Sequence, residues 1–389
     1  MQSGIFKFQA QERIVFATPA GEAVQAEADH YARSRVFVIS TRSLAKLHEG
    51  PLQRIERALG KRHVGTFTAI ASHSPREDVA AAAQQVRAAG ADLIVAVGGG
   101  SVVDATKAVL MCCWLGIDSA DAMNAHALGF DRNKRSTFDL PADPLRMIAV
   151  PTTLSAADFT SRAGITDTST GTKLAFGHRL MAPVSVILDP AATLDTPEWL
   201  LLSTGMRAVD HACESYCCPI ANPATESLSL KGLALLHDAL PGIRRTPADL
   251  DARMGAQFGM WHAIWPSASG TYMGASHGIG YALGAAFGVP HGHTSCVMLP
   301  AVLRWNSEEN GERQQALAAA AGRPGVPAWQ VIGDLVETIG QPRTLRDVGV
   351  SRTDLEDLAE RALGYQPVRQ NPRKIEAASD VMEILELAF

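Results

Sequence analysis

The segment VAVGGGSVVDATKAVL (residues 95–110) decides the fold of this chain. A short apolar run leads into Gly98, Gly99 and Gly100, and a helical pattern starts at Ser101. Glycines let a backbone approach a bound group closely, and the free amides of a helix N-terminus attract an anion. The segment therefore predicts a strand, loop and helix that hold a dinucleotide pyrophosphate. The alternative is a tight turn without a ligand, and the usual GxGxxG fingerprint is absent.

The residues around this loop bear on the rest of the cofactor. Asp104 and Lys107 follow one and two turns along the helix, where they could meet a ribose, a phosphate or each other. The segment ISTRSL (39–44) offers Thr41 and Arg42 where an NAD-specific protein places a carboxylate against the adenosine ribose. The sequence therefore leaves both NADH and NADPH open, and a plain surface loop is the alternative for this segment.

The first half of the chain alternates strand and helix patterns. A helix is predicted over REDVAAAAQQVRAAG (76–90), which ends on a glycine. Short apolar runs rich in Val and Ile predict buried parallel strands at 34–40, 63–70, 91–97, 146–150 and 184–188. This order predicts a parallel sheet covered by helices.

The second half has a different character. From about residue 195, Ala- and Leu-rich segments with helical period follow one another, separated by turns rich in Pro and Gly. We therefore expect an α/β dinucleotide-binding domain over residues 1–190 and an all-helical domain over 191–389 that carries the substrate or metal site.

Composition narrows the class of function. The chain has 389 residues, 47% of them hydrophobic and 19% charged, with a net charge of -5. This balance gives no reason to expect nucleic acid or an anionic membrane as a partner, so a small-molecule substrate is expected. Six cysteines in two adjacent pairs and two singles fit reduced thiols better than a disulfide framework. No secretory signal and no apolar run of roughly 18 residues are apparent, so a cytoplasmic protein is expected.

Four residues of the second half raise the question of a metal site. His211, His277 and His291 come from three separate segments, and imidazoles that converge in this way can hold Zn or Fe(II). Unrelated histidines are the alternative, since spacing alone does not bring them together. Arg207 lies four residues before His211 and so shares its helical face, which puts a permanent cation beside the imidazole.

Four motifs together resemble the iron-containing alcohol dehydrogenase superfamily. They are GGGSVVDATK, PTTLSAADFT (151–160), GMRAVDHACESY (205–216) and HGIGYALGAAFGVPHG (277–292), in the order and spacing of that family. TTLSAADFT and GVPHGHTSCVMLPAVLRWN are most similar to its maleylacetate reductase branch. The resemblance implies the dehydroquinate synthase-like fold, with an α/β domain, a helical domain, and cofactor and substrate in the cleft between them. It also implies a homodimer.

The resemblance assigns roles to individual positions. The family's metal ligands are an Asp and three histidines, and the histidines fall on His211, His277 and His291. The cofactor-binding positions fall on Gly99, Gly100, Ser101, Asp104, Thr152, Thr153, Ser155, Phe159 and Lys173. Thr41, after the first predicted strand, is the further candidate for cofactor binding named above.

The chain departs from the family at two positions. The Asp ligand falls on Arg207, and a histidine that relays a proton falls on Tyr281. A fixed cation at roughly 4 Å disfavours a metal by about 4 kcal/mol per unit charge at an effective dielectric near 20, and a divalent ion doubles the effect. A tyrosine hydroxyl still donates a proton, although it is a weaker acid.

These features favour an NAD(P)H-dependent reductase of a small carboxylate-bearing carbonyl or enone. The leading reaction is reduction of maleylacetate to 3-oxoadipate without a metal. Arg207 would bind the substrate, and His211, His277, His291 and Tyr281 would donate hydrogen bonds or a proton. The alternatives are a metal-dependent (Fe or Zn) alcohol dehydrogenase or aldehyde reductase, a lyase or cyclase on the same fold, and a binding protein without activity.

Overall fold

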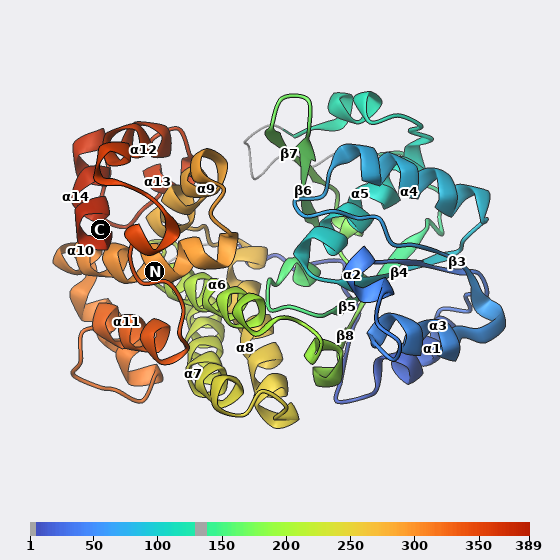
Figure 1. Ribbon diagram of the computed structural model, residues 1–389, viewed down its shortest axis with the longest axis horizontal. Coiled ribbons are helices and arrows are strands. Elements are labelled where there is room, and N and C mark those ends of the chain that lie inside the picture. Colours follow the sequence, from blue (N-terminus) through green and yellow to red (C-terminus); the bar gives the residue numbers. More distant parts are fainter. Residues whose placement is uncertain (1–4, 129–137) are drawn as a thin grey trace. The chain divides into compact units, whose positions relative to one another are not determined.

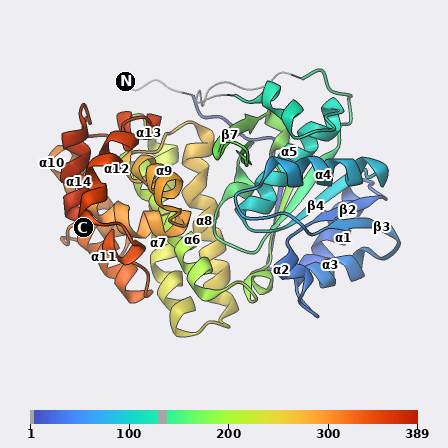
Figure 2. The same ribbon diagram turned by 45° about the horizontal axis from the view of Figure 1, so that its top comes forward.

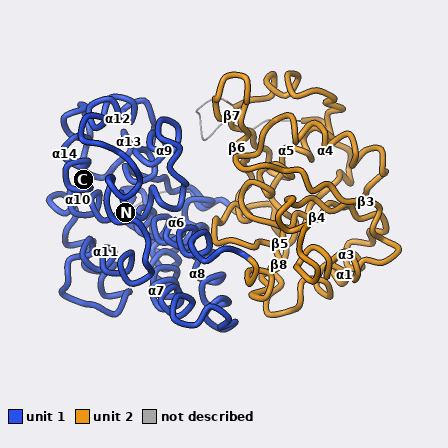
Figure 3. The backbone as a smooth tube through the Cα atoms, in the orientation of Figure 1, with its two compact units in different colours: residues 1–7, 196–389 blue, residues 8–195 orange. Residues whose placement is uncertain are grey.

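The computed structural model describes residues 5–128 and 138–389, which divide into two compact units (Figure 3). The α/β unit comprises Phe8–Asp195. The helical unit comprises Thr196–Phe389 together with residues 5–7. Each unit encloses a hydrophobic core of its own.

A six-stranded sheet forms the centre of the α/β unit (Figure 1). Its order is β1-β8-β5-β4-β2-β3, and all neighbouring strands pair in parallel. The strands are β1 (Arg13–Phe16), β2 (Val36–Ile39), β3 (His63–Phe67), β4 (Leu93–Gly98), β5 (Arg146–Pro151) and β8 (Ser185–Leu188). All five predicted strands are confirmed, whereas β1 was not predicted.

Helices cover both faces of this sheet (Figure 1). Side chains at alternate positions of β2 and β4, such as Val36 and Val95, pack in one core with residues of α1 (Ala20–His30) and α3 (Pro51–Leu59). The predicted helix appears as α4 (Arg76–Ala88), and it packs beside α5 (Gly100–Leu115). The short α2 (Arg42–Ala45) follows β2 directly. The alternation follows from the strand period of two and gives the predicted α/β fold class.

A two-stranded antiparallel hairpin also belongs to this unit. It consists of β6 (Arg162–Asp167) and β7 (Thr172–Gly177). Side chains of β6 alternate between half-buried and buried, because one face of the hairpin packs against α5.

The helical unit contains only helices and turns among the residues that the structure describes (Figure 2). Its α-helices are α6 (Glu198–Cys217), α7 (Pro223–Arg245), α8 (Leu250–Ser269), α9 (Ala275–Phe287), α10 (His291–Ala320), α11 (Ala328–Thr338), α12 (Leu355–Ala362), α13 (Gln366–Arg369) and α14 (Ala378–Ala388). Residues of α9, α10, α12, α13 and α14 share one apolar core. Helix α6 is buried along most of its length, so polar side chains on it need partners from its neighbours.

Two further observations concern membrane-spanning helices and the state of the cysteines. No helix within the described ranges is both long and apolar enough to span a membrane. All six cysteines are free, and five of them are buried.

Candidate active site

The register of the sheet brings the glycine loop beside the threonine motif. Gly98 at the end of β4 pairs with Pro151 at the end of β5, so the chain leaves both strands at the same edge. A Cβ on Gly99 would lie 3.0 Å from Cγ2 of Thr153, and one on Gly100 would lie 2.9 Å from Oγ of Ser155. The two loops therefore approach so closely that a side chain at either glycine would have to displace Thr153 or Ser155.

This edge has the properties of an anion site. Thr153 Oγ1 and Ser155 Oγ are buried and have no hydrogen-bond partner among the described residues. The N-terminus of α5 follows at Gly100, with Gly99 as its cap and without a side-chain capping bond. Buried hydroxyls need an acceptor or donor, and helix amides attract phosphate. The residues therefore fit the pyrophosphate of a dinucleotide.

The position in the sheet supports the same ligand. The chain runs outward from β2 to β3 and then returns to β4, so the strand order reverses between β2 and β4. Open α/β sheets bind ligands at this point, outside the carboxyl ends of the strands. Thr41 follows β2 there, is half-buried, and caps α2 by accepting a hydrogen bond from Leu44 N at 3.4 Å.

Asp104 and Lys107 form an ion pair with each other. Lys107 Nζ is fully buried and donates to Asp104 Oδ1 at 3.2 Å. It also donates to Thr160 Oγ1 and to the carbonyl oxygens of Ala157 and Arg162. These acceptors satisfy the ammonium group, so Lys107 joins α5 to the threonine motif and to β6.

The other predicted cofactor residues lie near the start of α5 or in the adjoining motif. Asp104 Oδ2 accepts a hydrogen bond from Gly164 N at 3.0 Å. The exposed side chain of Lys173 on β7 lies over Gly164, so that a Cβ added to this glycine would come 2.4 Å from Cε of Lys173. Ser101 Oγ accepts from the backbone of His73 at 3.1 Å. Thr152 is buried, and Phe159 has no exposed surface.

Asp158, in the threonine motif, is a buried acid that strongly affects stability. It is 1% exposed, and neither carboxylate oxygen has a hydrogen-bond partner among the described residues. Burial raises its pKa from 3.8 to about 7. The unfolded chain therefore ionises first as pH rises. Stability is fully present below about pH 4 and falls until about pH 7, by up to about 4 kcal/mol for a shift of this size.

Asp158→Asn is therefore expected to remove this contribution to the pH dependence of the free energy of unfolding. The variant should equal the parent near pH 4 and exceed it in free energy of unfolding above pH 7, measured by urea titration from pH 4 to 8. Asp167→Asn is the control of opposite sign, because Ser169 and Arg76 lower the pKa of Asp167. A parent–variant difference at Asp158 that does not change with pH would contradict this assignment.

The helical unit contains a cluster of buried charges around His277. Its Nδ1 lies 2.8 Å from Glu214 Oε2 and 3.3 Å from Asp210 Oδ2, so it must donate to these carboxylates. All three residues are buried. Burial and Arg207 lower the pKa of His277, but the two carboxylates outweigh them and raise it overall. The cluster therefore holds His277 as a cation in one ring orientation.

Arg207 adds the second cation of this cluster. Its Nη1 donates to Ser295 Oγ at 3.0 Å and lies 3.8 Å from Asp210 Oδ2. Its guanidinium carbon lies 5.6 Å from the centre of the Tyr281 ring. Burial alone would raise the pKa of Asp210, but His277, Arg207 and the hydrogen bond from Ser295 lower it. Two carboxylates thus balance two cations.

The other predicted residues of this unit are only partly brought together. The rings of His211 and His277 lie 5.0 Å apart, and Tyr281 meets His277 edge-on at 6.3 Å. His291 begins α10 and lies against Gly284, where an added Cβ would come 3.6 Å from its ring. Within the described residues, Asp210, Glu214 and His277 are the set whose ligand atoms approach within 4.8 Å of one another.

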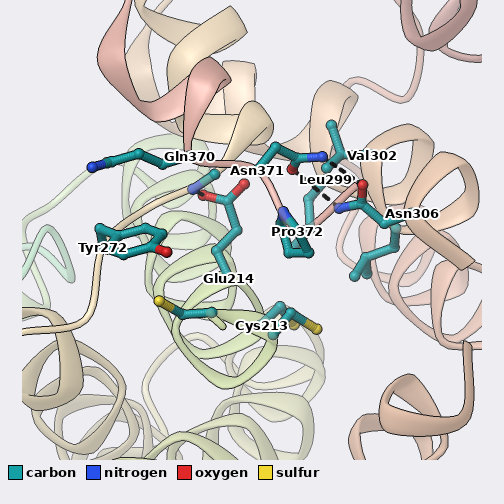
Figure 4. A pocket seen from close by; sticks show the side chains of 13 residues that line it. Cys213, Glu214, Tyr272, Leu299, Val302, Asn306, Gln370, Asn371 and Pro372 are labelled. Atoms are coloured by element: carbon teal, nitrogen blue, oxygen red, sulfur yellow. Dashed lines mark hydrogen bonds between the residues drawn. The ribbon is translucent and has the colours of Figure 1, made fainter. Parts of the chain in front are cut away.

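Both carboxylate oxygens of Glu214 also accept hydrogen bonds from the backbone. Oε1 accepts from Ser276 N at 2.8 Å and Oε2 accepts from Gly274 N at 2.8 Å. Figure 4 shows Glu214 at the wall of a cavity, near Asn371, which exchanges hydrogen bonds with Asn306. The cavity holds about 10 Å³, room for about one water molecule and too little for an organic substrate.

The atoms of this cluster that approach one another, His277 Nδ1, Glu214 Oε2 and Asp210 Oδ2, are engaged in hydrogen bonds and do not point lone pairs at a metal ion. His277 uses Nδ1 as a hydrogen-bond donor, and Asp210 Oδ2 already accepts from Ser276 and Ser295 at 2.8 and 2.6 Å. The charge of Arg207, whose Nη1 lies 3.8 Å from Asp210 Oδ2, also disfavours a cation beside this carboxylate. Zn and Fe sites need three or four free lone pairs directed at one point, with anionic or neutral ligands.

Sequence reasoning did not predict the contacts of His277 with Asp210 and Glu214, nor the two serines. Asp210 and Glu214 are four residues apart on α6, three after Arg207 and His211 respectively, so their helical spacing is a usable signal. Ser276 and Ser295 lie on α9 and α10, and no spacing rule links them to α6. Only the packing of the three helices reveals them.

Comparison with known proteins identifies the family. Residues 11–190 match the iron-containing alcohol dehydrogenase model, and residues 201–389 match that of the C-terminal Fe-containing alcohol dehydrogenase family. The chain is 30% identical to a maleylacetate reductase of Rhizobium sp. (strain MTP-10005), covering 98% of this chain and 96% of that one. It is 31% identical to dehydrogenase ALT3 of Alternaria alternata, covering 91% and 98% respectively.

The solved structures agree with this result. A crystal structure of maleylacetate reductase from Agrobacterium tumefaciens superimposes with a TM-score of 0.84 at 28% identity, covering 100% of this chain and 99% of that one. The chain therefore belongs to the iron-containing alcohol dehydrogenase superfamily, in its maleylacetate reductase-like branch, and is an NAD(P)-dependent oxidoreductase.

Proposed function

We propose that this protein is a metal-independent NAD(P)H-dependent reductase of a small carboxylate-bearing carbonyl or enone. Reduction of maleylacetate to 3-oxoadipate is the leading reaction. The observation that carries the proposal is Arg207 at the position of the family's anionic metal ligand, hydrogen-bonded to Ser295 and balanced by Asp210. Relatives named maleylacetate reductase, at about 30% identity over nearly the full chain, support the substrate.

The cofactor is assigned to the α/β unit. Gly99, Gly100 and Ser101 would receive the pyrophosphate, with Thr153 and Ser155 as hydroxyl partners. Asp104 and Lys173, together with the buried Thr152 and Phe159, complete the proposed cofactor region. When bound, the nicotinamide supplies the hydride that reduces the substrate.

The side chains of the helical unit supply binding and a proton. Arg207 binds the substrate carboxylate through parallel N–H donors. His277 is the general acid, because two carboxylates orient its ring and stabilise its charged form while Nε2 has no hydrogen-bond partner among the described residues. His211, His291 and Tyr281 surround the reacting group as further polar contacts.

Cofactor choice is tested at Thr41. No carboxylate follows β2 where an NAD-specific protein would place one, so we expect the parent to accept NADPH as well as NADH. Thr41→Asp should raise the KM for NADPH at least about tenfold, because the new carboxylate repels the 2′-phosphate. Thr41→Asn is the matched control without charge. Equal KM values for NADPH in the two variants would place the ribose elsewhere.

The proposed reaction is tested by its stoichiometry. One NAD(P)H should be oxidised for each maleylacetate consumed, with 3-oxoadipate as product identified by mass spectrometry. Consumption without NAD(P)H oxidation would instead indicate a lyase or cyclase, and turnover of simple alcohols with added Fe or Zn would indicate a metal-dependent alcohol dehydrogenase or aldehyde reductase. Cofactor binding without any turnover would indicate a binding protein. We further propose a cytoplasmic homodimer, following the family.

A further inference from the structure

Arg207 is held through one nitrogen of its guanidinium group, Nη1. Nη1 donates to Ser295 Oγ at 3.0 Å, and the hydroxyl of Ser295 donates onward to Asp210 Oδ2 at 2.6 Å. Ser295 and Asp210 are both fully buried, whereas the Arg207 side chain is 11% exposed. The chain of hydrogen bonds therefore runs from the guanidinium group into the interior of the helical unit.

A single oxygen of Asp210 anchors this chain. Besides Ser295, Oδ2 accepts the hydroxyl of Ser276 at 2.8 Å and lies 3.3 Å from His277 Nδ1. Ser276 and Ser295 thus make the same bond to Asp210, but only Ser295 also contacts Arg207. Three donors from α9 and α10 hold the carboxylate of Asp210 in place, so it can fix the position of Ser295.

We propose that Ser295 and Asp210 are positioning residues, which hold Nη1 of Arg207 and leave Nε and Nη2 for a substrate carboxylate. The inference rests on the proposed function, because it assumes that the ligand of Arg207 is a carboxylate. Nε and Nη2 form one of the two edges that can bind a carboxylate through two parallel bonds. A long side chain that is already fixed loses less rotamer freedom when its ligand binds, so the tether raises affinity without entering the chemical step.

Ser295→Ala tests the tether, with Ser276→Ala as the matched control. Calorimetry with succinate, a simple dicarboxylate, and steady-state kinetics with maleylacetate are compared in both variants. Ser295→Ala should weaken succinate binding and raise the KM for maleylacetate about tenfold, while kcat stays within about threefold, the pattern of lost uniform binding. Ser276→Ala removes a hydrogen bond to the same oxygen without touching Arg207, so it should raise the KM and weaken succinate binding clearly less than Ser295→Ala does.

Arg207→Lys is a second, independent test. A lysine keeps the charge, but its single nitrogen cannot bond Ser295 and also present a fork to the ligand. Succinate affinity should fall at least about tenfold, and thermal unfolding should show a folded protein. Affinity equal to that of the parent would overturn the proposal, since charge alone would then explain binding.

The outcomes separate this inference from the proposed reaction. Succinate binding that depends on Ser295, in protein that does not reduce maleylacetate, would support the tether and reject the reaction. Reduction of maleylacetate with equal effects of Ser295→Ala and Ser276→Ala would support the reaction and overturn the tether. A Ser295→Ala variant with low kcat and unchanged KM would also overturn it, because Arg207 would then act on the transition state.

Discussion

Arg207→Ala should lower kcat/KM for maleylacetate about 10³-fold, because two charge-assisted hydrogen bonds to the substrate are worth about 4 kcal/mol together. The variant also leaves Asp210 without its cationic partner on α6, although Ser276, Ser295 and His277 still contact that carboxylate. Steady-state kinetics at fixed, saturating NADPH measure the effect.

A substrate without a carboxylate provides the control for Arg207. A short aliphatic aldehyde offers the guanidinium group no anion to bind, so any residual aldehyde reduction should differ less than about tenfold between parent and Arg207→Ala. Equal losses with the acid and the aldehyde would mean that the variant damages the site in general. An unchanged kcat/KM for maleylacetate would remove Arg207 from the substrate site.

His277→Ala should lower kcat by about 10² to 10⁴, the range of general acid catalysis. The physical basis is the orientation of His277 by Glu214 and Asp210, which hold Nδ1 and favour the charged ring. The KM for NADPH should change little, because the proposed cofactor residues belong to the α/β unit. Rapid-mixing measurements of a single turnover separate this chemical step from product release.

Tyr281→Phe is the comparison that decides the proton donor. Tyr281 meets the His277 ring edge-on, with the ring centres 6.3 Å apart. A phenol is the weaker acid near neutral pH, so its removal should lower kcat less than tenfold. A large loss in Tyr281→Phe together with a small one in His277→Ala would reverse the assignment.

Much of the fold follows from local pattern. The strands β2 and β4 are continuous apolar runs buried on both faces, and such runs are conspicuous in a sequence. Strand β1 is four residues long at the edge of the sheet and half-exposed, so its pattern resembles a loop. The β6–β7 hairpin was missed although its first strand alternates in burial, because polar residues and Gly164 dilute the signal.

The candidate site was predictable at its sequence motifs but not in its contacts. The glycine loop is visible in the chain itself, whereas the departure at Arg207 is a prediction that rests on the family resemblance. The role of Lys107 was left open, since only the folded structure shows its nitrogen enclosed by carbonyl oxygens. Ser295, which connects Arg207 to Asp210, and Ser276, which also donates to Asp210, come from other helices, and tertiary packing alone brings them there.

Turnover of maleylacetate by metal-free protein tests the central claim most directly. The protein is stripped of metal, its metal content is measured, and NADH and NADPH oxidation is followed with excess chelator present. If Arg207 binds the substrate and His277 donates the proton without a metal, the rate of NAD(P)H oxidation should match that of untreated protein. It should not rise when Zn or Fe(II) is restored. Loss of activity in chelator, with recovery on adding either metal, would contradict the account.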